Sequence, residues 1–213
     1  MKKLVLTALA VIMLTPLRAN AFDWGSFLRW FFFGANNVQT VTTDEIKSTL
    51  TSVQAQEKTL DESVQKSFLA IIPLLTTQKD QTKYEKEIQK INSSSETDAK
   101  KNSQILDLIS EYTTTVKNNK VGVLLIMKTS SDTDKTTLKN NLTTLSNAAQ
   151  SYTELYKKGY DLTAKTSTTE DSEQTTAVAN LNSASDSLKN KATVVYSFVN
   201  QVKTLATLSG IKL

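Results

Sequence analysis

The segment FLAIIPLL, residues 68–75, is one of the two most apolar stretches after residue 43, and it contains Pro73, one of only two prolines in the chain. Apolar residues around it recur every three or four positions, which is the period of an α-helix. The pattern predicts one helix over about 44–91, and Pro73, which has no amide hydrogen, predicts a kink or break within it. Because this helix is longer than the other predicted helices, it would either overhang the bundle or fold back at Pro73. The apolar stripe comprises Ile46, Leu50, Val53, Leu60, Val64, Phe68, Ile71 and Leu75, extended by Tyr84, Ile88 and Ile91.

Three further helices are predicted by the same spacing downstream. Short turns force consecutive helices to run antiparallel. The predicted fold is therefore all-α: an elongated up-down antiparallel bundle of about four long helices over residues 43–213, with the first helix kinked near Pro73. The later helices cover about 98–128, 132–165 and 170–209, the polar turns lie at 92–95, 129–132 and 166–169, and Gly210 is the expected terminator.

The second apolar stretch, VGVLLIM at residues 121–127, is compatible with two structures. A short strand is the alternative to helix, because an apolar run of this length fits either. The spacing of four that continues from Tyr112 favours helix. Folding the chain at the first turn would place residues 121–127 opposite residues 63–69. FLAIIPLL and VGVLLIM would then lie in the same half of the bundle, where they would form a thickened core or a hidden membrane-active surface.

Residues 1–21 have the pattern of an export signal. Lys2 and Lys3 precede an apolar core at residues 4–14, and Ala19-Asn20-Ala21 is a small-x-small cleavage site. A membrane anchor is the competing interpretation, but the apolar core is well short of the roughly 20 residues that a spanning helix needs. We therefore expect a cleaved leader and export by the general secretory route, to the periplasm or out of the cell.

An aromatic N-terminal segment and linker, residues 22–42, follows the leader. Its part DWGSFLRWFFFG, residues 23–34, holds both tryptophans and four of the seven phenylalanines. Such a segment is apolar on every side of any helix that it forms, so its side chains must be buried against another surface. It would plug the bundle, enter a membrane interface or dock in a partner's groove. The expected contact residues are Phe22, Trp24, Phe27, Leu28, Trp30, Phe31, Phe32 and Phe33.

Composition argues against most catalytic chemistry. The chain has no cysteine and no histidine, which removes thiol nucleophiles, Ser-His-Asp triads and zinc sites that need imidazole or thiolate. The leader carries three of the 25 basic residues and none of the 21 acidic ones. The remainder is nearly neutral, which weakens any case for nucleic-acid binding. We predict no catalytic residue, cofactor, metal or small-molecule substrate.

Three weak motifs have simpler explanations. Ser63 and Lys66 match the Ser-x-x-Lys pattern of penicillin-interacting enzymes, but the accompanying Ser-Asp-Asn and Lys-Thr-Gly elements are absent. Asp132 to Asp134 and the EDSE run at 170–173 lack the glycine and terminal glutamate of a calcium loop, and carboxylates at helix starts explain both. Tyrosines recur every fourth residue over 152–160, a pattern typical of core and boundary packing.

The layout of an export signal followed by a cysteine-free bundle of long helices is similar to that of minor pilus-tip subunits of type IV secretion systems. It is also similar to the bodies of small α-helical pore-forming toxins. The likeness covers architecture and no motif. The sequence predicts a non-enzymatic exported protein that binds a protein partner or a membrane surface within the cell envelope or a secretion-system assembly, with self-association left open. The alternative is a membrane-active protein that exposes its aromatic segment and the 68–75 and 121–127 patches.

Overall fold

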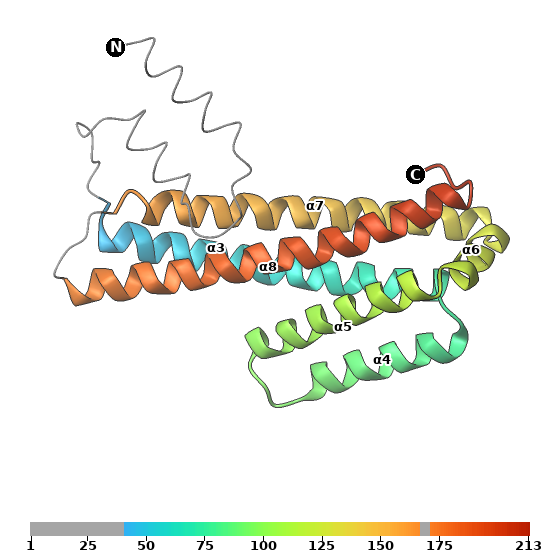
Figure 1. Ribbon diagram of the computed structural model, residues 1–213. Helices are drawn as coiled ribbons and strands as arrows, with labels where there is room; N and C mark the ends of the chain where they lie inside the picture. Colours follow the sequence, from blue (N-terminus) through green and yellow to red (C-terminus); the bar gives the residue numbers. More distant parts are fainter. Residues whose placement is uncertain (1–40, 167–170) are drawn as a thin grey trace, which may run out of the picture. The chain divides into compact units, whose positions relative to one another are not determined.

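The computed structural model describes residues 41–166 and 171–213 (Figure 1). Their regular elements are all helical, and no strand occurs among them, which confirms the predicted all-α class. The predicted leader and the aromatic stretch up to residue 40 lie outside the described residues. The elements are α3 (Thr43–Ile71), the 3-10 helix η1 (Ile72–Leu74), α4 (Gln78–Ser93), α5 (Asp98–Asn118), α6 (Lys120–Thr129), α7 (Asp132–Thr163) and α8 (Ser172–Leu208).

Three long helices, α3, α7 and α8, pack against one another along their lengths (Figure 1). Helix α7 runs antiparallel to both α3 and α8. Its 32 residues extend about 48 Å at 1.5 Å per residue. The α4–α5 hairpin lies beside this group, with α5 against α8 and α4 against α5, and α6 lies at the end where α5 leads into α7.

The helix predicted over 44–91 is broken at Pro73, where the chain folds back; this is one of the two outcomes that the sequence left open. Helix α3 ends at Ile71, η1 follows, and α4 runs back along the molecule. Proline cannot donate the amide hydrogen that a continuing helix needs. The Ile72 carbonyl oxygen instead accepts from the Leu75 amide at 3.1 Å, the Thr76 hydroxyl at 2.9 Å and the Tyr112 hydroxyl at 3.2 Å. The predicted four helices become six in the described residues.

The predicted helix over 98–128 is also divided. Helix α5 ends at Asn118, and Asn119, with φ −101° and ψ 37°, turns the backbone before α6 begins at Lys120. Residues 121–127 are helical, so the strand alternative is excluded. Helix α6 packs against the end of α8 and has little contact with α3, contrary to the predicted facing of 121–127 with 63–69.

Aromatic side chains from four helices meet where the hairpin joins the long helices. Tyr112 of α5 packs edge-on against Phe68 of α3 at 5.3 Å and against Tyr84 of α4 at 4.8 Å between ring centroids. Phe198 of α8 contacts Phe68 at 5.4 Å. All four rings are buried. The FLAIIPLL stretch therefore forms core, with the Phe68, Ile71, Ile72 and Leu75 side chains fully enclosed.

Gly210 ends α8 as predicted. Its φ of +79° lies in the left-handed region that glycine enters without steric cost. The Ile211 amide donates to the Ala206 carbonyl at 2.9 Å and the Gly210 amide donates to the Thr207 carbonyl at 3.0 Å, which is the Schellman arrangement. This turn brings Ile211 into the core, beside the end of the helix.

Helices α7 and α8 approach each other closely at Gly159. A Cβ atom at this position would lie 2.1 Å from the Ser185 hydroxyl oxygen, and Ser185 is fully buried. Gly159→Ala should therefore lower the free energy of unfolding by about 1–3 kcal/mol through overpacking, although alanine is the better helix former. Urea denaturation followed by circular dichroism measures the change.

The double variant Gly159→Ala with Ser185→Ala removes the clashing oxygen and should recover most of the lost stability. Gly122→Ala is the matched control, because its Cβ would meet only the end of the exposed Asn119 side chain. A Gly159→Ala protein as stable as the wild type would show that α7 and α8 are not held at this separation.

Candidate functional site

A buried lysine is the most chemically distinctive feature of the described residues. Lys191 of α8 is 4% exposed. Its ammonium nitrogen lies 2.7 and 2.5 Å from the two carboxylate oxygens of Asp61 and 2.8 Å from Oε1 of Glu57. Glu57 and Asp61 are four residues apart on α3 and therefore lie on the same helix face. Three acceptor oxygens thus meet the three N–H groups of one ammonium.

The Asp61 carboxylate connects four helices. Besides Lys191, it accepts a hydrogen bond of 2.7 Å from the Tyr152 hydroxyl of α7 and one of 2.5 Å from the Asn102 amide of α5. Burial, followed by the adjacent Asp61 carboxylate, raises the pKa of Tyr152, so this hydroxyl remains a neutral donor. The Lys191 ammonium also lies 5.8 Å from the centre of the Tyr152 ring. We call Glu57, Asp61, Asn102, Tyr152 and Lys191 the buried charge cluster.

The buried charge cluster has the geometry of a structural junction. No buried side-chain nitrogen or oxygen among the described residues lacks a hydrogen-bond partner. The two principal surface grooves, one between α4 and α5 and the other between α3 and α7, contain none of its members. A lysine nucleophile or a carboxylate base must reach its substrate, and here every such group is occupied by another side chain.

The sequence analysis missed this cluster, although it contained a signal for it. Lys191 falls on the apolar face of α8, between Leu188 and Val195, and Asp61 falls on that of α3, just before Val64. A charge at a core position indicates a partner elsewhere, since an unpaired buried charge is very costly. Periodicity does not identify that partner, which here is 130 residues away.

The weak motifs of the sequence have structural explanations. Ser63 is half-buried and Lys66 is exposed. Asp134 forms a capping box with Ser131 at the start of α7, and the Asp171 carboxylate caps α8 by accepting from the Glu173 amide at 2.9 Å. In residues 41–166 and 171–213, no three carboxylates are grouped so that they could hold a metal ion.

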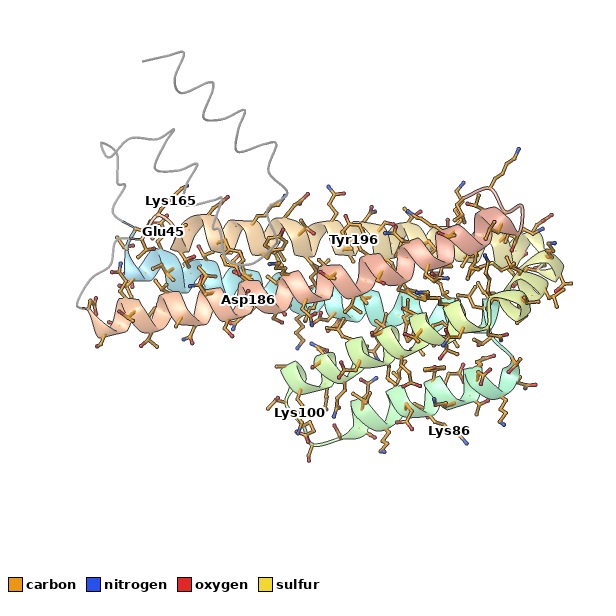
Figure 2. The ribbon with its side chains drawn as sticks, viewed as in Figure 1. Glu45, Lys86, Lys100, Lys165, Asp186 and Tyr196 are labelled. Carbon is orange, nitrogen blue, oxygen red and sulfur yellow. The ribbon has the colours of Figure 1, made fainter. Side chains whose placement is uncertain are left out.

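Exposed apolar side chains gather at one end of the described structure. Val121 and Leu125 of α6 are 73% and 62% exposed, and Leu208 of α8 is 52% exposed. The Ser209 hydroxyl, next to Leu208, donates to the sulfur of Met127 at 3.5 Å and joins the two helix ends. Tyr196, by contrast, is exposed farther back along α8 (Figure 2).

The three contact regions predicted from the sequence, residues 22–33, 68–75 and 121–127, differ in where the structure places them. Phe22, Trp24, Phe27, Leu28, Trp30, Phe31, Phe32 and Phe33 lie outside the described residues. The 68–75 patch is core, whereas the 121–127 patch has a buried face at Val123 and Met127 and an exposed face at Val121 and Leu125. Within the described part of the chain, no helix is long and apolar enough to cross a membrane.

Comparison with known proteins gives no family assignment. No protein-family model, curated protein or solved structure matches the chain. The functional argument therefore rests on the residues themselves.

Removing the buried ammonium should destabilise the fold. Lys191→Met leaves the Asp61 and Glu57 carboxylates without their cation, and loss of one partner of a buried pair typically costs about 3–5 kcal/mol. Urea unfolding monitored by circular dichroism measures this free energy. Lys100→Met is the matched control: Lys100 pairs with Glu96 at the surface, where such a pair contributes less than about 1 kcal/mol. Equal effects of the two substitutions would show that the buried charge cluster does not hold the helices together.

Proposed function

We propose that the chain is an exported, non-enzymatic helical-bundle protein that acts by binding within the cell envelope or a secretion-system assembly. The observation that carries this proposal is the distribution of apolar surface. The core encloses the Phe68, Ile71, Ile72 and Leu75 side chains of the FLAIIPLL stretch, whereas Val121 and Leu125 of α6 and Leu208 of α8 are exposed. Clustered apolar side chains on a soluble surface are typical of binding sites.

The aromatic segment adds a second source of binding energy. Residues 22–33 carry eight large apolar side chains, which favours cover by a partner or a membrane interface over exposure to water. Burying even half of these rings would contribute on the order of 10 kcal/mol before the costs of ordering. We propose this segment as the principal anchor, with the helical bundle as the rigid body that it attaches.

The buried charge cluster also supports binding over catalysis. Its lysine and carboxylates are the groups with the most unusual surroundings in the described residues, yet each is used to join helices. The groove between α4 and α5 is lined by side chains such as Glu87, Lys90 and Glu111, which lie on an open surface. Neither place combines an enclosed pocket with an activated nucleophile or base, the combination on which an enzymatic assignment would rest.

A second candidate function is membrane activity. The observation that favours it is the pair of lysines, Lys120 and Lys128, on either side of the exposed Val121 and Leu125. A pore-forming version would also have to expose the 68–75 patch. Four of its side chains are buried in this structure, among them the Phe68 ring at the centre of the aromatic cluster. We therefore rank envelope binding first.

Crosslinking in intact cells tests the proposed function. A specific envelope partner should crosslink to the wild-type chain and, once purified, bind it directly. Trp30→Ala with Phe31→Ala should weaken that binding at least tenfold, since aromatic anchors dominate interface energy. Tyr196→Ala, which removes an exposed ring on α8, is the control and should bind like the wild type. Undiminished binding by the double variant would contradict the proposed role of the segment.

A dye-release experiment separates the two candidate functions. The purified mature protein, at low micromolar concentration, should leave vesicles sealed, because the most apolar stretch of its helical bundle stays within the core. Release of dye by the wild type, abolished in the Trp30→Ala with Phe31→Ala variant, would reverse the ranking in favour of membrane activity.

A further inference from the structure

Helix α6 and the adjoining end of α8 form a surface with only one sign of charge. Residues 112–131 and residues 187–213 contain no aspartate and no glutamate. The lysines of these two segments that lie near α6 are exposed to solvent. They are Lys117, Lys120, Lys128 and Lys212.

Helix α6 is apolar on two opposite faces. Val123 and Met127, four residues apart, are buried against the core. Val121 and Leu125 have the same spacing on the other face, which is open to water, and Lys128 continues that face by three residues. The described helices bury Val123 and Met127 but leave the Val121 and Leu125 side chains exposed.

The carboxylates that come next after α6 in the chain, and the one at the start of α4, are engaged locally. Asp132 pairs with Lys135 at 3.0 Å, and Asp134 accepts from the amide and the hydroxyl of Ser131 at 3.1 and 2.8 Å. Asp80, at the start of α4, accepts from the Thr77 hydroxyl at 3.0 Å. None of these carboxylates forms an ion pair with a lysine of α6.

We propose that this surface is a docking site for an anionic lipid bilayer. We call it the basic apolar end and define it as Val121 and Leu125 with Lys117, Lys120 and Lys128. The apolar side chains would enter the boundary between head groups and acyl chains, and the lysines would contact lipid phosphates. At ten residues, α6 is far shorter than the roughly 20 that span a bilayer, so the contact is peripheral.

Charge favours a bilayer over a second copy of the chain. In a two-fold symmetric contact the same surface meets itself, so two basic apolar ends would bring their lysines together. Like charges facing each other across an interface oppose association. An anionic lipid bilayer can both bury the exposed apolar side chains and pair its phosphates with the surrounding lysines. This inference rests on the proposed function. It identifies an anionic lipid bilayer as one of the surfaces that the protein binds.

A site-specific fluorophore tests the contact directly. The chain has no cysteine, so Leu125→Cys supplies the only thiol for an environment-sensitive dye. In the full mature chain, this dye should shift to shorter wavelength when vesicles containing one part phosphatidylglycerol to two parts phosphatidylcholine are added, and much less with phosphatidylcholine alone. Lys100→Cys carries the control dye. Lys100 is on α5, at the end away from α6 (Figure 2), and a dye there should not shift.

The charge requirement is tested by flotation with the same vesicles. Lys120→Gln with Lys128→Gln should lower the partition coefficient by about tenfold or more, because each lysine near an anionic surface contributes about fivefold. Val121→Ser with Leu125→Ser should lower it by about tenfold. The control, Lys86→Gln with Lys100→Gln on α4 and α5 (Figure 2), should bind within about twofold of the wild type. Thermal unfolding verifies that each variant is folded.

Two results would overturn the inference. In the first, the chain floats with anionic vesicles while the dye at position 125 does not shift, which would assign lipid binding to another part of the protein. In the second, the dye shifts without vesicles as protein concentration rises, which would show that a second copy covers the basic apolar end. Either result leaves the partner crosslinking through residues 22–33 unaffected, so failure here is distinguishable from failure of the proposed function.

Discussion

The missing amide hydrogen of Pro73 is the constraint on which the arrangement of helices depends. A helix that reaches Pro73 loses a backbone hydrogen bond and meets a steric clash, and the chain responds by reversing within η1 and the turn after it. The reversal produces the α4–α5 hairpin and brings Tyr112 beside Ile72, where its hydroxyl donates to the carbonyl oxygen of the interrupted helix. The hairpin in turn carries Asn102 to the Asp61 carboxylate of α3.

The buried charge cluster has a different role from the aromatic core beside it. Apolar packing is tolerant of sliding, whereas the Asp61 carboxylate accepts its hydrogen bonds only at one relative position of α3, α5, α7 and α8. Desolvating Lys191 and two carboxylates offsets much of the attraction between them. We therefore regard the cluster chiefly as a device that fixes helix register. Such a device suits a rigid body that presents surfaces to partners.

The two faces of α6 connect this rigid body to the proposed function. One face completes the core through Val123 and Met127, so the position of the helix is set by packing. The other face holds Val121 and Leu125 in water. Lys120 and Lys128 of the same helix are exposed, and Asp132 and Asp134, the next carboxylates along the chain, are occupied by local partners. A helix built in this way offers an apolar, positively charged surface in a fixed orientation, and lipid docking requires no change in the rest of the fold.

The sequence by itself determined the helical class, the cap at Gly210 and the existence of two polar turns, because helical period and capping chemistry act within a few residues. These turns were predicted at 92–95 and 129–132 and lie at 94–97 and 130–131. Composition alone also predicts that the side chains of residues 22–33 are buried against another surface, and this remains a prediction because the segment lies outside the described residues. Only the tertiary structure decided that Pro73 marks a reversal and that Lys191 pairs with Asp61. A kink at Pro73 and a reversal at Pro73 lose the same backbone hydrogen bond. Which of the two forms therefore depends on the side chains that each arrangement buries. A lysine on an apolar face is explained only by the carboxylates that folding brings to it.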